Sequence, residues 1–214
     1  MTRPLGVVDV AYRAVGDVPS RVSAAIADGF DHIDVALDEV HRVEGLAVGC
    51  PTAFPKPVDT WCATPAPSAD VPGAWDRAVR WWRAAPHALC EPWAGSVVGT
   101  LDAMRAFREA VPGVRFLIDT GHVASWGGDP CEVLDWADHV QCRQGGPGVA
   151  QLRHDDPAGT VDFGSVFRHL DARGYRGRVS VEYFDLPELG WPCPDPRAWA
   201  CDLAAWLRAQ DWWG

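Results

Sequence analysis

Four polar side chains stand at or near the ends of short apolar runs in the second half of the chain. They are Glu91, Asp119, Gln141 and Glu182. If those runs are parallel strands, the four side chains meet at one edge of the sheet. Three carboxylates brought together would repel one another unless a cation neutralises them. Oxygen ligands suit Mn²⁺ or Mg²⁺, with Co²⁺ or Zn²⁺ as alternatives, so the pattern predicts one divalent metal ion bound by these four residues.

Strand and helix signals alternate along the whole chain. Helical spacing of apolar residues, such as Val22, Ala25 and Ile26, separates most of the apolar runs. Such alternation predicts a parallel sheet covered by helices. We therefore expect a single domain, residues 1–214, folded as a compact (β/α)8 TIM barrel. The eight predicted strands are residues 5–10, 32–37, 45–50, 58–62, 87–91, 114–119, 139–142 and 178–183.

The expected barrel is short of helices in one place. Residues 38–44 leave little room for a crossover helix, and residues 51–72 contain six prolines. We therefore expect the second and third helices to be shortened or missing, with an incomplete barrel or an open α/β sheet as the structural alternative. Later, Asp129 followed by Pro130 predicts an N-cap and the start of a helix that continues through Ala137.

Composition and charge favour a small-molecule partner. The net charge is −10, which opposes nucleic-acid binding because that binding depends on Lys and Arg contacts to phosphates. No apolar run reaches membrane-spanning length, and the first residues lack the features of a signal peptide. We expect a cytoplasmic protein without nucleic-acid or membrane partners. The sequence leaves open whether it forms a homodimer. The seven cysteines contain no C-x-x-C pair, so neither a disulfide framework nor a zinc ribbon is indicated.

Three segments carry a resemblance to a known family. LCEP at 89–92, LIDTGH at 117–122 and YRGRVSVE at 175–182 resemble the xylose isomerase-like sugar phosphate isomerases and epimerases. Within that family, HVQ at 139–141 and RHDDPAGTVDF at 153–163 are most similar to the hydroxypyruvate isomerase branch. The resemblance covers the chain best from about residue 89 to 191. It implies a TIM barrel and carbohydrate metabolism.

The resemblance also assigns roles to residues. It implies that Glu91, Asp119, Gln141 and Glu182 are the metal ligands. It further implies that His122, Arg153 and His154 contact the substrate. We expect Glu91 and Glu182 to be catalytic, one removing a proton next to a carbonyl group and the other returning it.

Three positions depart from the family pattern. The acidic residue expected after the seventh strand is missing around Arg143 and Gln144, Pro157 replaces a glycine, and Trp93-Ala94 follow the first metal ligand where a polar residue is common. Trp93 and Trp126 each follow a ligand strand and are expected to form walls of the pocket. Aromatic walls favour a bulky or ring-bearing substrate.

The predicted function is a divalent-metal-dependent isomerase or epimerase of a sugar-like hydroxy-carbonyl compound, acting through an enediolate. The alternative is a lyase on the same site, either a dehydratase or an enzyme that cleaves a C-glycoside. A DNA-repair endonuclease and a non-catalytic binding barrel are less favoured. Asp34 has two interpretations, a pocket wall or a core hydrogen bond, and His139 is assigned a structural role.

Overall fold

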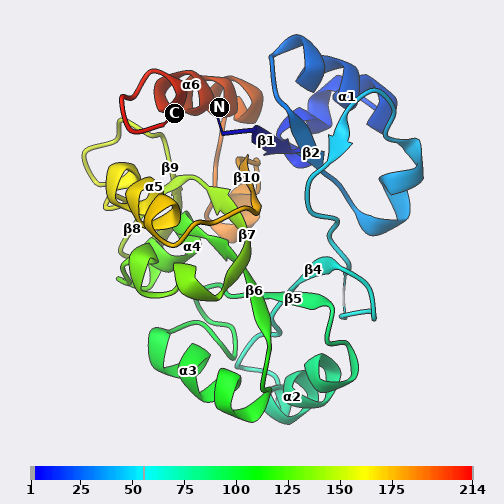
Figure 1. The fold of residues 1–214 in the computed structure, drawn as a ribbon, viewed down its shortest axis with the longest axis vertical. Coiled ribbons are helices and arrows are strands. Elements are labelled where there is room, and N and C mark those ends of the chain that lie inside the picture. Colours follow the sequence, from blue (N-terminus) through cyan, green and yellow to red (C-terminus); the bar gives the residue numbers. More distant parts are fainter. Residues whose placement is uncertain (1–2, 55, 214) are drawn as a thin grey trace.

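Eight parallel strands form the central sheet of the protein, with helices on the outside (Figure 1). The computed structural model describes residues 3–54 and 56–213. The strand order is β3-β2-β1-β10-β7-β6-β5-β4, which is the sequential order of a barrel. The strands are β1 Leu5–Val8, β2 His32–Asp34, β3 Ala47–Val48, β4 Cys62–Pro65, β5 Ala88–Glu91, β6 Arg115–Asp119, β7 Ala137–Cys142 and β10 Arg178–Val181.

A few backbone contacts join the two edge strands. β3 and β4 do not pair directly, but Thr52 forms isolated parallel bridges to Ala36 and to Ala63. Hydrogen bonds from Thr52 N to Val35 O and from Ala63 N to Pro51 O, 2.9 and 2.8 Å long, support these bridges. The sheet therefore curls round into a barrel in which strand pairing is weakest between β3 and β4.

The helices lie on the outer side of the strands. The α-helices are α1 Val18–Ala27, α2 Ala74–Ala84, α3 Leu101–Ala110, α4 Thr120–Ser125, α5 Phe163–Ala172 and α6 Pro196–Arg208. Short 3-10 helices are η1 Asp9–Val15, η2 Leu37–Arg42, η3 Pro130–Glu132, η4 Leu134–Trp136 and η5 Pro187–Leu189. None of the helices in the described ranges has the length and apolar character needed to cross a membrane.

The expected shortage of helices is confirmed between β2 and β4. Only η2 follows β2, and the described residues between β3 and β4 contain no helix. The first three strands are shorter than predicted, and two other predictions differ more. The fourth strand lies at Cys62–Pro65 and shares only Cys62 with the predicted range, because pairing with β5 extends it through Pro65. The helix expected from Asp129 is two 3-10 turns, since the backbone of Val133 (φ −120°) interrupts it.

Strand alternation decides which side chains face the barrel interior. In β5, Cys90 belongs to the main core beneath the helices, whereas Leu89 packs inside the barrel with Cys50, Ala63 and Leu117. A residue two positions after Leu89 shares its face. Glu91 therefore points inward at the carboxyl end of its strand.

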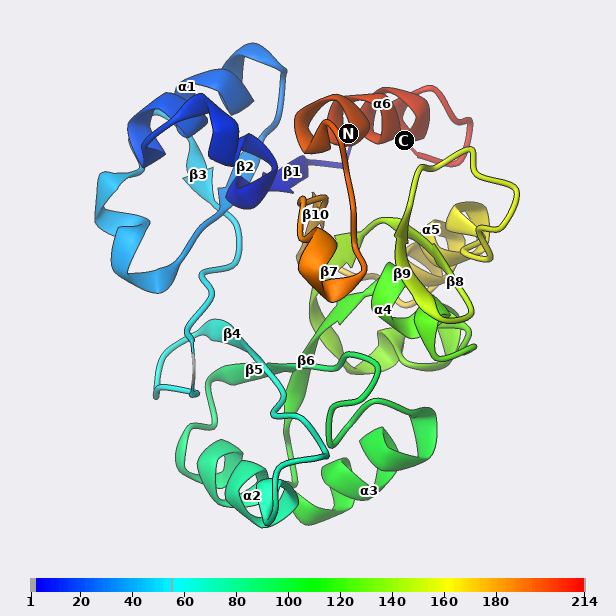
Figure 2. The same ribbon diagram turned by 180° about the vertical axis from the view of Figure 1, so that it is seen from behind.

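A two-stranded antiparallel hairpin interrupts the last part of the barrel. It consists of β8 Gln144–Gly146 and β9 Val149–Leu152, directly after β7. The hairpin lies against α4, as the view from behind shows (Figure 2). This packing brings residues that follow β7 over residues that follow β6.

Candidate active site

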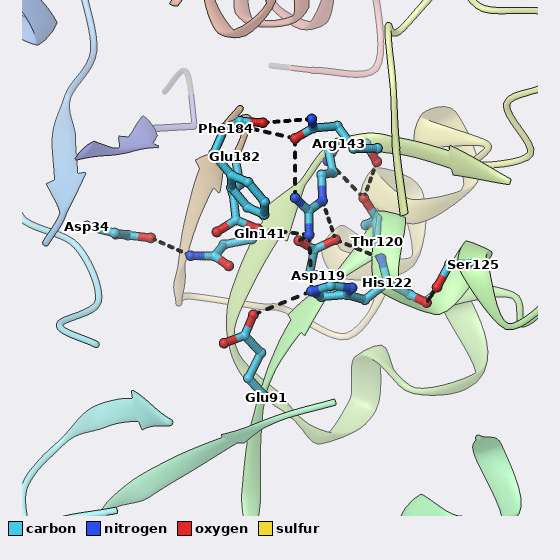
Figure 3. Close-up of polar contacts among 11 residues, drawn as sticks. Asp34, Glu91, Asp119, Thr120, His122, Ser125, Gln141, Arg143, Glu182 and Phe184 are labelled. Atoms are coloured by element: carbon cyan, nitrogen blue, oxygen red, sulfur yellow. Dashed lines mark hydrogen bonds and ion pairs between the residues drawn. The ribbon is translucent and has the colours of Figure 1, made fainter. Parts of the chain in front are cut away.

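The four residues expected at the strand ends lie at one mouth of the barrel (Figure 3). Glu91 and Asp119 are the last residues of β5 and β6, and Glu182 directly follows β10. Gln141 of β7 pairs in register with Asp119 on one side and with Ser180 on the other. All four side chains are buried.

A cavity of about 1100 Å³ opens at this mouth. Glu91, Gln141, Glu182 and His122 line its polar part. Its aromatic residues are Phe54, Trp93, Phe184 and Trp191. The indole nitrogen of Trp93 donates to the carbonyl of Ala66 at 2.6 Å, which fixes the ring as a wall.

Arg143 occupies the centre of the polar cluster, and sequence reasoning did not assign it a role. Its Nη2 atom lies 2.8 Å from Asp119 Oδ2 and 3.2 Å from Glu182 Oε2. The guanidinium group is fully buried. Strand alternation could have located it, because Arg143 is two residues after Gln141 and so continues the inward face of β7.

The surroundings of Arg143 hold each end of its guanidinium group. Nε donates to Asp119 Oδ1 at 3.3 Å, and Nη1 is 3.5 Å from Gln151 Oε1. Nη2 is also 3.1 Å from His122 Nε2. The ring of Phe184 lies 4.8 Å from the guanidinium carbon. Because an arginine nitrogen can only donate, His122 Nε2 accepts this contact and its proton resides on Nδ1.

The backbone on both sides of the cluster is fitted to Arg143. The hydroxyl of Thr120 donates to Arg143 O at 2.7 Å and accepts from Arg143 N at 3.1 Å. A Cβ atom at Gly121 would lie 2.2 Å from Ala150 O and 2.7 Å from Arg143 Cγ. A side chain at Gly121 is therefore excluded, and the TGH segment of residues 120–122 has a steric reason for its glycine.

Burial and the charges around Arg143 separate the pKa values of the site. Burial raises the pKa of Glu91 to about 7, and the charge of Asp119 adds to the rise. Burial also raises the pKa of Glu182 well above its usual range, although Arg143 opposes the rise. For Asp119, burial acts to raise the pKa, but Arg143, His122 and the hydrogen bonds from Glu182 and from the His122 backbone together lower it. The cluster thus combines two carboxyl groups with raised pKa values, Glu91 and Glu182, and one with a lowered pKa, Asp119.

His122 is uncharged near neutral pH. Burial lowers its pKa to about 4, and Arg143 adds to this effect. The 3.9 Å contact between His122 Nε2 and Glu91 Oε1 is therefore not an ion pair. His122 Nδ1, Gln141 Oε1 and Glu182 Oε2 have no hydrogen-bond partner among the described residues. Glu182 Oε2 is close enough to Arg143 for an ion pair but lacks the angle of a hydrogen bond.

Asp34 satisfies both of its interpretations. It lines the cavity, and its Oδ2 lies 2.7 Å from His139 Nε2. It also accepts from Cys50 N at 2.7 Å and from Gln141 Nε2 at 3.3 Å. The last contact orients the Gln141 amide, so that its oxygen stays free for another partner.

Three residues expected to contact substrate lie outside the cavity. Arg153 pairs with Asp202 at 3.1 Å and is about half exposed. His154 packs on Trp206, with ring centroids 5.7 Å apart. Trp126 packs against the core beside α4. Arg153 and His154 lie outside because β9 ends at Leu152 and the chain then turns outward. Trp191, which the sequence analysis did not assign to the wall, packs on His122 with ring centroids 5.6 Å apart.

The residues at the mouth have the oxygen chemistry of a divalent-ion site but not its arrangement. Arg143 already bridges the carboxylates of Asp119 and Glu182 that such an ion would bridge. Two unit charges 4 Å apart repel by about 4 kcal/mol at an effective dielectric constant of about 20, and the ion carries two charges. Among the described residues no group of three His, Cys, Asp or Glu side chains is placed to hold a metal ion. The site as built therefore does not fit the ion that the sequence predicts.

Comparison with known proteins decides the family. The sequence model of the xylose isomerase-like TIM barrel family matches residues 24–210. The chain belongs to this family. The family assignment agrees with the predicted fold and with the segments that carried the resemblance. We found no match to this sequence among curated proteins.

Solved structures of the same fold include sugar epimerases and a dehydratase. The chain is similar to 3-keto-D-glucoside 4-epimerase from E. coli, with TM-score 0.69, 17% identity and coverage of 97% and 100% of the two chains. It is equally similar to D-allulose 3-epimerase from Methylomonas sp., with TM-score 0.69, 16% identity and coverage of 97% and 96%. A probable 3-DHS dehydratase from Bacillus anthracis has TM-score 0.65, 13% identity and coverage of 94% and 98%.

Proposed function

We propose that this family member is an isomerase or epimerase of a sugar-like hydroxy-carbonyl compound, acting by proton transfer. The observation that carries the proposal is the pair Glu91 and Glu182. Both carboxyls are buried, line one cavity from different strands, and have raised pKa values. Perturbed carboxyl groups in a cleft are the usual components of acid–base catalysis. The epimerases of the same fold support this reaction class.

The two glutamates can take complementary roles in proton transfer. With a pKa of about 7, Glu91 is partly ionised at neutral pH and can take the proton from the carbon next to a carbonyl. Glu182, whose pKa burial raises well above its usual range, can hold a proton and deliver it to the enediolate carbon. After one turnover Glu91 holds a proton and Glu182 has lost one. Exchange with solvent restores both groups, or the next turnover runs the two transfers in the opposite direction. One C–H bond breaks and one forms, so no outside oxidant is needed.

The unpartnered atoms of the site suit the oxygens of such a substrate. His122 carries its proton on Nδ1, and Gln141 has its Oε1 unpartnered in the described part of the chain because Asp34 already holds the amide nitrogen. Both atoms are buried, so each needs a small side-chain rotation to reach a substrate oxygen, His122 as donor where negative charge develops and Gln141 as acceptor from a hydroxyl. These roles use atoms that otherwise lack partners among the described residues.

Solvent exchange in heavy water tests the proposal. Sugars and ketoses incubated with the protein should acquire deuterium at the reacting carbon, measured by NMR or mass spectrometry. Glu91→Gln and Glu182→Gln should each lower the rate by about 10²–10⁴-fold. Glu109→Gln, on the exposed face of α3, is the matched control and should keep the wild-type rate. Rates that stay near normal in both site variants would reject the proposal.

A lyase is the second candidate, and the cavity favours it. At about 1100 Å³, with Trp93 and Trp191 among its walls, the cavity exceeds what a small sugar fills. An aromatic glycoside or a dehydratable acid would use the same proton abstraction and then lose a leaving group. Release of that group, in place of proton return, would identify this reaction. The hydroxypyruvate isomerase branch stays a prediction from the sequence.

A further inference from the structure

The buried cluster at the barrel mouth contains its own cation. Glu91, Asp119 and Glu182 are all buried, and one guanidinium group lies among them. We propose that Arg143 is the permanent counter-cation of this site and takes the place of the divalent metal ion. The proposal concerns charge and metal affinity, and it holds whichever reaction the site catalyses.

The guanidinium group is built into the cluster and is not a surface side chain that has folded inward. Its three nitrogens contact Asp119, Glu182, His122 and Gln151, and Phe184 covers it. Gln151 is itself held, because it donates to Phe184 O at 2.8 Å and accepts from Phe184 N at 3.1 Å. The side chain that contacts Nη1 is therefore fixed by the backbone that follows β10.

The path by which Arg143 could leave is also closed. Its backbone is bonded on both sides to the Thr120 hydroxyl, and Gly121 lies directly against its aliphatic stem. The side chain has no exposed surface. The guanidinium group is thus enclosed by α4, the β8–β9 hairpin and the segment after β10.

Gln144, the residue after Arg143, supplies no negative charge that could bind a metal ion. The amide of Gln144 accepts from Gly145 N at 3.0 Å and from Val161 N at 2.8 Å, and donates to Val161 O at 3.2 Å. Its polar atoms are thus committed to backbone groups away from the cavity. Besides the neutral His122, Arg143 and the carboxyls of Glu91, Asp119 and Glu182 are the ionisable groups of this cluster, while Asp34, Asp9 and Arg13 line other parts of the cavity.

Metal content and thermal shift measure the proposal directly. Protein produced in medium supplemented with Mn²⁺ should contain less than about 0.1 ion per chain by elemental analysis. After treatment with EDTA, addition of MnCl2 or MgCl2 should leave the Tm of the wild type and of Arg143→Lys unchanged. Arg143→Ala frees the carboxylates, so it should bind about one Mn²⁺ per chain and gain about 5–10 °C at 100-fold excess over Kd. Arg197→Ala, which removes an arginine elsewhere, should behave as wild type.

Two results would overturn the proposal. One is about one tightly bound ion per chain in the wild type, lost in Asp119→Ala, because the guanidinium group would then yield to the metal. The other is an Arg143→Ala protein that folds but does not bind Mn²⁺, because the carboxylates would then not form an ion site. If Arg143→Ala does not fold, the wild-type and Arg143→Lys measurements decide. Since the readout is metal content, the result is independent of whether Glu91 and Glu182 transfer a proton.

Discussion

Two arginine–aspartate pairs in this protein have opposite surroundings. Arg197 in α6 binds Asp28, the C-cap residue of α1, through two parallel contacts of 2.8 and 2.9 Å. Arg143 binds Asp119 less regularly, with contacts of 2.8 and 3.3 Å. Yet the Arg197 side chain is 44% exposed, whereas Arg143 is fully buried.

The comparison shows that contact geometry alone does not rank these pairs. Water can replace the partner of Arg197 or Asp28 when either is removed, so the pair adds little net stability. Water cannot reach Asp119, and a lone carboxylate there would keep its full desolvation cost. The less regular pair is therefore the one the fold depends on.

Removal of each arginine should show the largest difference. Arg143→Met leaves Asp119 buried without a counter-charge and should lower the free energy of unfolding by about 3–5 kcal/mol. Arg197→Met leaves Asp28 in contact with solvent and should cost about 1 kcal/mol or less. Urea denaturation at pH 7 in the presence of EDTA measures both. Equal losses in the two variants would contradict the contrast drawn from burial.

Glycine substitutions should give a smaller difference of the same kind. Gly121→Ala places a methyl group against Ala150 O and Arg143 Cγ, and it should cost about 1–3 kcal/mol through overpacking. Gly164→Ala in α5 meets chiefly the mobile end of Arg168, and it should be neutral or slightly stabilising. Thermal denaturation of both variants compares them. A Gly121→Ala protein as stable as wild type would mean that the contacts around Arg143 are loose.

The pH dependence of stability should differ in sign, with the smallest effect at Asp28. Hydrogen bonding to Arg197 lowers the pKa of Asp28 to about 2, so its contribution is present above the unfolded value of 3.8 and is lost as pH falls toward 2. Burial raises the pKa of Glu91 from 4.5 to about 7, so its contribution is present below 4.5 and is lost as pH rises through 7.

Denaturation across pH 2–8 tests these two slopes. Asp28→Asn should reduce the loss of stability at the acid end, to which the lowered pKa of Asp119 also contributes. Glu91→Gln should reduce the loss between about pH 4.5 and 7, to which the raised pKa of Glu182 also contributes. Each variant is the control for the other, because each changes one slope only. If Glu91→Gln leaves the slope between those values as it is in the wild type, then Glu91 does not titrate there.

Local patterns in the sequence determined most of the barrel. Apolar runs of strand length, followed by polar residues, identified Glu91, Asp119, Gln141 and Glu182 as strand-end residues, because strand alternation is a local property. Proline content and spacing predicted the missing helices between β2 and β4. The helix predicted from Asp129 is absent, because a cap and a proline can start a helix but its continuation depends on the packing of the chain that follows.

Only the tertiary structure decided how the charges at the mouth are balanced. The sequence places Arg143 two residues after Gln141, but a single strand does not show what an inward side chain meets. That depended on the position of β6, on the β8–β9 hairpin and on the segment after β10, which together supply Asp119, Gln151, Phe184 and Glu182. The same packing turned Arg153 and His154 outward and brought Trp191 over His122. Electrostatic balance in a buried site arises from contacts distant in sequence, so no local pattern encodes it.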